Sequence, residues 1–93
     1  SWGTALAVAL APRCREVRLW VRQPDRAAAL QASRVNTIYL PGVSLPPAVT
    51  ASSELAFVLT GAELVLAVVP SRYWREVARA AAPWLPPQAT VVC

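Results

Sequence analysis

A short, almost unbroken run of apolar residues constrains the fold of this chain more than any other feature. Residues 63–69 read ELVLAVV, and Pro70 and Ser71 close the run. The run has the length of a strand and is rich in Val and Leu, which is typical of a parallel strand covered on both faces. Because parallel strands are joined by crossover connections that are usually helical, we expect an α/β sheet.

Helical and strand patterns alternate along the rest of the chain, as a parallel sheet requires. Pro24 and Asp25 favour a helix start, since both residue types suit the first helical turn. Ser52, Ser53 and Glu54 are expected to cap a further helix. The predicted order is helix 2–11, strand 16–20, helix 25–33, short strand 49–51, helix from residue 55, strand 63–69, helix 72–82 and strand 89–93.

The composition is sufficient for a hydrophobic core and argues against metal binding and most general-base catalysis. The 93 residues are 56% hydrophobic and 15% charged, which is typical of one folded domain. The chain has no His and no Lys, so it lacks the commonest metal ligand and most general bases. Cys14 and Cys93 match no zinc spacing. We therefore expect no metal site.

The net charge of +4 does not indicate a nucleic-acid site, because the nine arginines are scattered and no RNA-binding aromatic motif accompanies them. No apolar stretch reaches the roughly 18 residues of a spanning helix. Residues 2–12 resemble a signal-peptide core, but this helix feeds directly into the alternating pattern and so belongs to the domain. We expect neither nucleic acid nor a membrane span.

Ser1, Trp2 and Gly3 stand at the start of the first predicted helix. A dinucleotide-binding fold places the third glycine of G-x-G-x-x-G in such a first turn, where it allows close helix–strand packing. Backbone N–H groups there bind a pyrophosphate, helped by the helix dipole. Gly3 suits that position, although from Gly3 alone an ordinary helix-start glycine is the better interpretation.

The chain has no Met, so we expect it to be a fragment whose first strand and first two motif glycines lie upstream. In the usual strand order 3-2-1-4-5-6, that first strand would lie between strands 16–20 and 63–69.

The most specific segment of the sequence is NTIYLPG at 36–42, which has the pattern Asn-x-x-Tyr-Leu-Pro-Gly. Four other segments accompany it in order and spacing: SWGTALA at 1–7, EVRLW at 16–20, GAELV at 61–65 and VPS at 69–71. Together these segments resemble bacterial NAD(P)-dependent glycerol-3-phosphate dehydrogenase. The resemblance runs over the whole chain and covers only the interior of the family's cofactor domain.

The resemblance implies a Rossmann-type α/β fold, a parallel sheet with flanking helices, with residues 1–93 forming part of an N-terminal NAD(P)-binding domain. The first strand and the C-terminal helical domain would be missing. The cofactor would be NAD or NADP. An Arg near the adenosine ribose, where an acid would select NAD, tolerates or favours a 2′-phosphate. By position, the implied cofactor contacts are Ser1, Trp2, Arg22, Gln23 and Tyr39.

The sequence also predicts where three aromatic residues in the last quarter of the chain lie. Tyr73 lies just beyond the Pro70 end of a strand, where ligands bind in such sheets, and is a candidate to line the cofactor cleft. We expect Trp74 and Trp84 to lie in the core.

By resemblance, the parent enzyme moves a hydride between nicotinamide and C2 of sn-glycerol 3-phosphate, giving dihydroxyacetone phosphate. This implies a cytoplasmic enzyme of phospholipid precursor synthesis, and it is compatible with a homodimer. The family's reaction uses lysines that lie beyond this chain, so we expect no catalytic residue within it. Two alternatives stay open: a ketopantoate or pyrroline-carboxylate reductase type of enzyme, against which the 36–42 segment argues, and a non-catalytic fragment that binds nothing.

Three positions depart from the family pattern. Cys14 stands where a Gly usually ends the first helix with positive φ, and a Cys in that conformation would cost roughly 1–2 kcal/mol. Ile38 precedes Tyr39 where a basic residue is usual, and Gln23 replaces a residue that is often basic. The choice between NAD and NADP therefore stays open.

Overall fold

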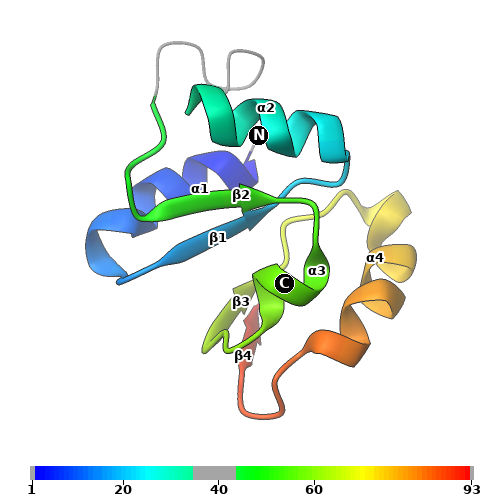
Figure 1. Cartoon of the computed structure of the whole chain (residues 1–93). Coiled ribbons are helices and arrows are strands. Elements are labelled where there is room, and N and C mark those ends of the chain that lie inside the picture. The colour runs from blue at the N-terminus through cyan, green and yellow to red at the C-terminus, as the bar shows by residue number, and fades with distance from the viewer. Residues whose placement is uncertain (1, 35–43, 93) are drawn as a thin grey trace. The chain divides into compact units, whose positions relative to one another are not determined.

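The computed structural model describes residues 2–34 and 44–92, with only the backbone of Trp2. The chain divides into two compact units, Ser1–Ser53 and Glu54–Cys93, called unit 1 and unit 2 below. Its strands form two separate two-stranded parallel sheets, β1–β2 in unit 1 and β3–β4 in unit 2 (Figure 1). The predicted alternation of helices and parallel strands is confirmed.

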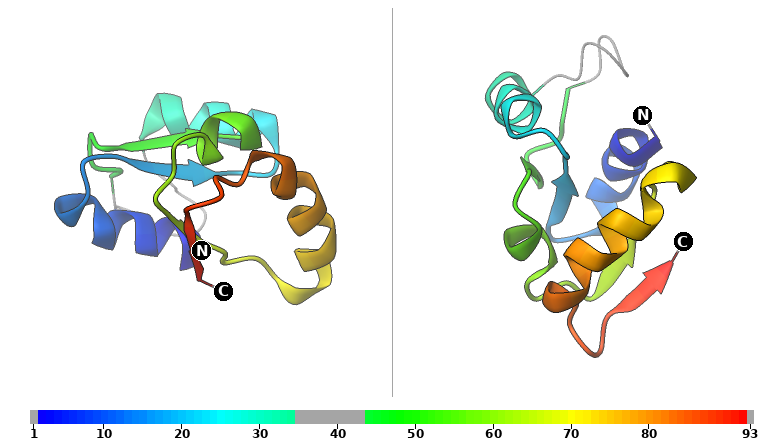
Figure 2. Two further views of the ribbon diagram at one scale, coloured as in Figure 1. Left: turned by 90° about the horizontal axis from the view of Figure 1, so that it is seen from below. Right: turned by 90° about the vertical axis from the view of Figure 1, so that its right-hand side faces the viewer.

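Unit 1 is built around the sheet of β1 (Val17–Trp20) and β2 (Val49–Ser52). The two strands run in parallel, with Val17 opposite Val49 and Trp20 opposite Ser52. Helix α1 (Trp2–Leu10) contacts β1, and helix α2 (Pro24–Ser33) contacts β2 (Figure 2). This arrangement is a β-α-β unit, with α2 as the crossover, preceded by one more helix.

Helix α2 begins as its sequence predicts. Gln23 is the N-cap, Pro24 occupies the first turn and Asp25 is the acid that complements the helix dipole there. Its buried side chains are those of Ala27 and Leu30, so that one narrow face packs against the sheet.

Small residues on one face let α1 lie close to the sheet. Thr4, Ala7 and Ala11 are buried and recur at intervals of three and four residues, which is one helical face. Partly buried Val8 and Leu19 pack against the core of unit 1. This core consists of Ala7, Ala11, Leu30, Leu45, Val49 and Ala51.

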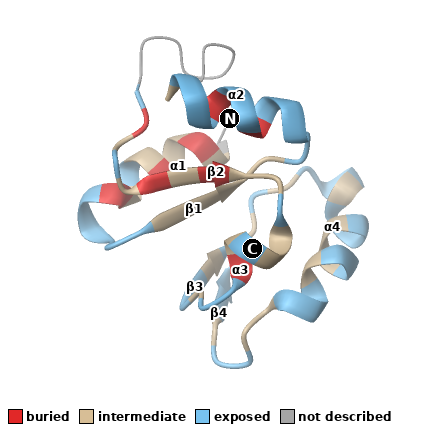
Figure 3. Ribbon diagram, in the orientation of Figure 1, coloured by how far each residue is buried: buried red, intermediate tan, exposed pale blue. Residues whose placement is uncertain are grey.

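Unit 2 contains α3 (Leu55–Leu59), β3 (Leu64–Leu66), α4 (Trp74–Ala81) and β4 (Thr90–Val92). Short 3-10 turns at Ser71–Tyr73 and Ala82–Trp84 flank α4. Leu64 lies opposite Thr90 and Leu66 opposite Val92. Among the described residues of this unit, Leu59 alone is buried (Figure 3).

The predicted burial of the ELVLAVV strand on both faces is wrong. β3 spans three residues, and Leu64 and Leu66 are 52% and 37% exposed, whereas Val65 between them is half-buried. Alternate residues of a strand point to opposite faces, so only the Val65 face is covered. Burying both faces needs a layer of structure on each side of the sheet, and within the described residues of unit 2 the Leu64 and Leu66 side chains stay exposed.

The predicted core positions of two tryptophans are also wrong. Trp74 is 39% and Trp84 49% exposed. α4 is strongly amphipathic, yet none of its residues is buried, and its main contacts within unit 2 are with the short helix α3 and the flanking turns.

Two local predictions fail for reasons of backbone geometry. The N-cap of α3 is Glu54 rather than a serine, and no side chain caps it, because Ser52 is the last residue of β2. Cys14 has φ −121°, an extended conformation that needs no glycine. The 3-10 turn Ala11–Arg13 carries the chain out of α1 instead, so the expected strain is absent.

Candidate functional site

Two features that the sequence assigns to a cofactor site lie at the carboxyl end of β1: the start of α1 and the turn at Arg22 and Gln23. In parallel α/β sheets, ligands bind beyond the carboxyl ends of the strands. Helix α1 runs opposite to β1, so its first turn lies at this end of the strand (Figure 2). Arg22 and Gln23 follow β1 directly and lead into α2. The start of α1 and the turn at Arg22 and Gln23 therefore share one edge of unit 1.

Two hydrogen bonds hold this edge together beyond the strands themselves. The backbone N–H of Val21 donates to the carbonyl oxygen of Ser52 at 2.9 Å. The indole Nε1–H of Trp20 donates to the carbonyl oxygen of Ser53, also at 2.9 Å. The chain is thus fixed up to the residue before Arg22, whose side chain is exposed.

The edge can receive an anion. The first turn of α1 carries no acidic residue, so no carboxylate neutralises the positive end of its dipole. Gln23 caps α2 without a side-chain hydrogen bond to the helix, and both Arg22 and Gln23 are exposed to solvent. Contacts of these groups with the phosphates and the adenosine ribose of a dinucleotide stay a prediction.

Three of the five predicted contact side chains cannot be placed. Ser1, Tyr39 and the side chain of Trp2 lie outside the described residues. The structure therefore places Arg22 and Gln23 at the same edge of unit 1 as the start of α1, and the assignment of all five residues to the cofactor stays a prediction.

The carboxyl end of β3 in unit 2 leads through Pro70 into the turn Ser71–Tyr73. Tyr73 is half-buried there, and its backbone N–H donates to the carbonyl of Pro70 at 2.9 Å. The guanidinium carbon of Arg72 lies 4.8 Å from the centre of the Tyr73 ring, within range of a cation–π contact. A cofactor contact by Tyr73 stays a prediction.

The ion pair of unit 1 lies at the opposite end of β1. Arg18 Nε lies 2.9 Å from Glu16 Oε2, and Arg18 Nη2 lies 3.1 Å from Glu16 Oε1. The hydrogen bond from Arg18 lowers the pKa of Glu16, desolvation opposes this shift, and the charge of Arg18 adds to it. Because Glu16 precedes β1 and Arg18 is the second residue of that strand, this pair lies at the amino end of β1 and outside the candidate site.

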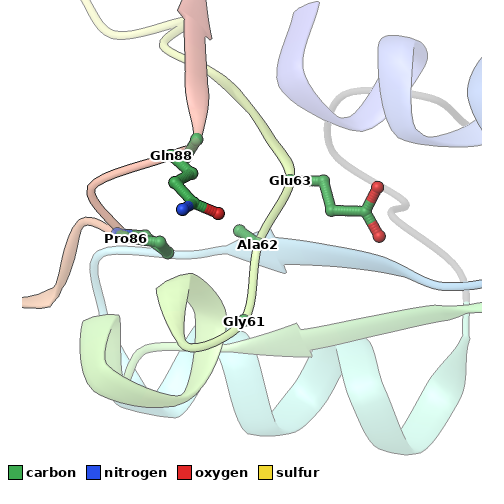
Figure 4. Close-up of a pocket in the computed structure, with 6 residues that line it drawn as sticks. Gly61, Ala62, Glu63, Pro86 and Gln88 are labelled. Carbon is green, nitrogen blue, oxygen red and sulfur yellow. The ribbon is translucent and has the colours of Figure 1, made fainter.

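An open pocket in unit 2 also lies at the amino ends of its strands. Its lining comes from residues just before β3 and just before β4 (Figure 4). The Gln88 side chain points toward Ala62, whereas the Glu63 carboxylate points away from Gln88 and Pro86. This edge is opposite to the one where such sheets bind ligands, so we do not assign the pocket to the cofactor. The lining residues are Gly61, Ala62, Glu63, Pro86, Gln88 and Ala89.

Within residues 2–34 and 44–92, no cluster of His, Cys, Asp or Glu could hold a metal ion. In the same residues, no helix has the length and apolar character needed to cross a membrane.

Sequence reasoning missed one side-chain cluster in unit 1. Arg34 and Gln31, at the end of α2, make several hydrogen bonds to β2 and the residues before it. The sequence offers one indication of this cluster. Arg34 follows the last helical residue, Ser33, at the position where Gly or Asn is usual.

Comparisons with known proteins agree on one family. The sequence matches the family model described as NAD-dependent glycerol-3-phosphate dehydrogenase N-terminus over residues 1–93. Glycerol-3-phosphate dehydrogenase (NAD(P)+) of Alcanivorax borkumensis is 46% identical over 92 residues, which are 99% of this chain and 27% of that protein. The chain therefore spans about a quarter of the length of this relative.

Two solved structures share the fold. Glycerol-3-phosphate dehydrogenase from Coxiella burnetii superposes with a TM-score of 0.89 at 37% identity, over 97% of this chain and 28% of that one. The enzyme of that name from Saccharomyces cerevisiae gives a TM-score of 0.84 over 97% of this chain and 29% of that one. Because the Saccharomyces cerevisiae structure is only 18% identical in sequence, its similarity shows the fold alone.

The predicted Rossmann-type α/β class is confirmed by these likenesses, and the reductase alternatives are not favoured. Because the family model covers the whole sequence, the chain belongs to the family described as the N-terminus of NAD-dependent glycerol-3-phosphate dehydrogenase.

Proposed function

We propose that residues 1–93 are part of the N-terminal NAD(P)-binding domain of a longer glycerol-3-phosphate dehydrogenase. The parent enzyme would interconvert sn-glycerol 3-phosphate and dihydroxyacetone phosphate with NAD(H) or NADP(H), in the cytoplasm, for phospholipid precursors. We propose further that the parent acts as a homodimer.

One observation carries this proposal: the family match extends over all 93 residues, including the segment that holds Arg22 and Gln23. The geometry of unit 1 supports it independently. A helix start without acidic residues and an exposed arginine lie at the carboxyl edge of a parallel sheet. This edge is where the fold class places a dinucleotide.

The residues of the chain would bind and orient the cofactor. Backbone N–H groups at the start of α1 would hold the pyrophosphate, and Arg22 with Gln23 would contact the adenosine ribose or its 2′-phosphate. Ser1, Trp2 and Tyr39 would complete the set. The bound nicotinamide supplies the hydride chemistry. The substrate-binding and proton-transferring residues would come from parts of the parent outside this sequence, since the chain contains no Lys or His.

Steady-state turnover of the complete gene product tests the proposal. We expect NAD(P)H oxidation with dihydroxyacetone phosphate, and none with ketopantoate or pyrroline carboxylate, the substrates of the two alternative families. The 93-residue chain alone should give no turnover above the blank. Turnover with either alternative substrate, and none with dihydroxyacetone phosphate, would show that the assignment is wrong.

A further inference from the structure

The side of β2 that faces away from β1, called its outer edge below, has no ladder partner in the described part of the chain. On the side that faces β1, the carbonyl oxygen of Ser52 accepts from the N–H of Val21 at 2.9 Å. The backbone groups of successive residues point to alternate sides of a strand, so those of Val49 and Ala51 point to the outer edge. Unpaired groups at such an edge are a template for the addition of another strand.

Side chains from the end of α2 occupy this edge. Arg34 Nη2 donates to the carbonyl oxygen of Val49 at 2.6 Å, and Gln31 Oε1 accepts from the N–H of Ala51 at 2.8 Å. Arg34 Nη1 also donates to Gln31 Oε1 at 3.0 Å, so the two side chains brace each other. We call Arg34 and Gln31 the α2 clasp. The clasp takes up one acceptor and one donor that a further strand would need.

The start of β2 adds to this arrangement. The N–H of Val49 donates to the carbonyl oxygen of Pro46 at 3.0 Å, and the same oxygen accepts from Arg34 Nη2 at 2.7 Å. A strand that paired with the outer edge would have to replace these bonds. The three bonds of the guanidinium come from a charged donor and are therefore stronger than neutral ones, which makes the replacement unfavourable.

The backbone of Arg34 indicates that its side chain is there for these bonds. Arg34 follows the last residue of α2 with φ 63° and ψ 15°, and it is the one non-glycine residue with positive φ in the described part of the chain. Glycine usually occupies such a position, because other side chains are strained there. A strained conformation persists where the surrounding contacts hold it, and here the contacts are those of the guanidinium.

We propose that the α2 clasp guards the outer edge of β2 against a second copy of this chain. Two copies could pair through the same edge, with their β2 strands antiparallel about a twofold axis. The clasp occupies the backbone groups that this pairing needs. Pairing would also bring two Arg34 guanidiniums together without their acceptors, so repulsion between like charges opposes it. The inference goes beyond the proposed function, since no cofactor takes part in it.

The test uses Arg34→Gly and Gln31→Leu in the complete gene product, where the upstream strand is predicted to cover the free edges of β1 and β3. Glycine keeps the positive φ and removes the guanidinium, whereas leucine removes the acceptor of the Ala51 N–H. We expect both variants to associate as their concentration rises, towards a molar mass about twice that of wild type. Sedimentation velocity over a range of concentrations measures this.

Amide hydrogen exchange shows whether the new contact lies at the outer edge. In dilute solution, the Ala51 N–H of Gln31→Leu should exchange about tenfold faster than in wild type, because it has lost its acceptor. At concentrations where the variant associates, this exchange should slow again, because a carbonyl of the second copy replaces the lost acceptor. In wild type, the rate should be the same at both concentrations.

Three control variants separate edge pairing from general loss of stability. Gln31→Glu keeps an acceptor for both donors of the clasp. Arg15→Gly removes an exposed arginine that precedes β1, and Leu59→Ala removes a buried side chain of unit 2. Measured below their melting temperatures, all three should keep the molar mass of wild type.

Each other outcome overturns the inference. Arg34→Gly and Gln31→Leu proteins that keep the wild-type mass would show that the clasp guards nothing. Association without renewed protection of the Ala51 N–H would place the contact elsewhere, and equal association of Leu59→Ala would mean that destabilisation suffices. If Arg34→Gly does not fold, Gln31→Leu and Gln31→Glu decide. None of these results depends on turnover, so the proposed function stands or falls separately.

Discussion

Several side chains in the described part of the chain form hydrogen bonds with backbone groups that lie far along the sequence. Trp20 and Arg34 both donate to carbonyl oxygens of residues far along the chain, and Gln31 accepts from a strand N–H. The described ion pair, Glu16 with Arg18, joins neighbours on the surface instead. Side chains that bond distant backbone groups fix the path of the chain. An exposed ion pair contributes little to the free energy of unfolding, because water and salt screen it.

The Glu16–Arg18 pair predicts a small pH dependence of stability. The hydrogen bond from Arg18 lowers the pKa of Glu16 below its ordinary value of 4.5, so the ionised carboxylate favours the folded state. The stabilisation is present above the pKa of the unfolded chain and is lost as pH falls through the folded value. Glu16→Gln should therefore lower the free energy of unfolding slightly at neutral pH and not in acid. Urea titrations at both pH values check this. A difference that persists in about 1 M salt would contradict an exposed ion pair.

Arg22 is predicted to bias the choice of cofactor in the complete enzyme. A guanidinium near the ribose binds a 2′-phosphate, whereas a carboxylate there accepts from the 2′-hydroxyl of NAD. Arg22→Asp should raise the ratio of kcat/KM for NAD over NADP by about tenfold or more, since a hydrogen bond to a charged group contributes about 1.5–3 kcal/mol. Arg15→Asp is the matched control, because exposed Arg15 precedes β1 and lies at its other end. An equal change in both variants would remove Arg22 from the site.

Among the elements, α1 shows how side-chain size sets the approach of a helix to its sheet. Its buried face consists of Thr4 and Ala7 and continues to Ala11 in the following 3-10 turn, and the half-buried Gly3 stands at the start of the helix. Small residues allow close packing, which brings the helix start to the carboxyl edge of β1, where a phosphate would need to meet it.

Close packing of α1 makes a testable prediction. Ala7→Leu adds bulk to a filled contact and should lower the free energy of unfolding by about 1–3 kcal/mol. Ala9→Leu places the same side chain at an exposed position of the same helix and should change it by less than about 0.5 kcal/mol. Urea denaturation of the two variants checks this. Equal effects would mean that the Ala7 face does not pack against the sheet.

The elements also show what a sequence of this kind can reveal. The start of α2 was predictable, because Pro24 and Asp25 act locally through fixed φ and charge. The end of α2 was not, because Arg34 holds its conformation through Pro46 and Val49, which lie beyond the reach of any local rule. The position of Arg22 and Gln23 at a strand end followed from the alternation of elements. The exposure of Trp74 and Leu64 did not, because apolar patterns show which residues can be buried and not whether anything covers them.

At the scale of the whole molecule, each unit holds a sheet of only two strands among the described residues. β1 pairs with β2 and β3 with β4, so each strand has an edge without a backbone ladder partner in that part of the chain. Such edges favour self-association. The predicted strand order places a further strand, the one that precedes α1 in a complete dinucleotide fold, beside both β1 and β3.

Restoring that strand is predicted to stabilise the chain. About ten upstream residues of the gene product, a strand followed by Gly-x-Gly, should raise the unfolding midpoint by ~10 °C or more and suppress aggregation, since each kcal/mol shifts the midpoint of a domain this size by about 4–8 °C. An extension of equal length made of Gly and Ser is the control. Thermal melts and light scattering compare the three proteins. A short chain that is monomeric and melts as high as the extended one contradicts the strand order.

Hydrogen exchange of the complete protein, with and without NADP(H) or NAD(H), tests the central claim most directly, because it reports where the cofactor binds. We predict protection at the start of α1, at residues 22–24 and in segment 35–43, with no change in the pocket residues Gly61–Glu63 and Pro86–Ala89. Protection confined to that pocket, or none in this chain at saturating cofactor, would contradict the assignment of the cofactor site to the carboxyl edge of β1.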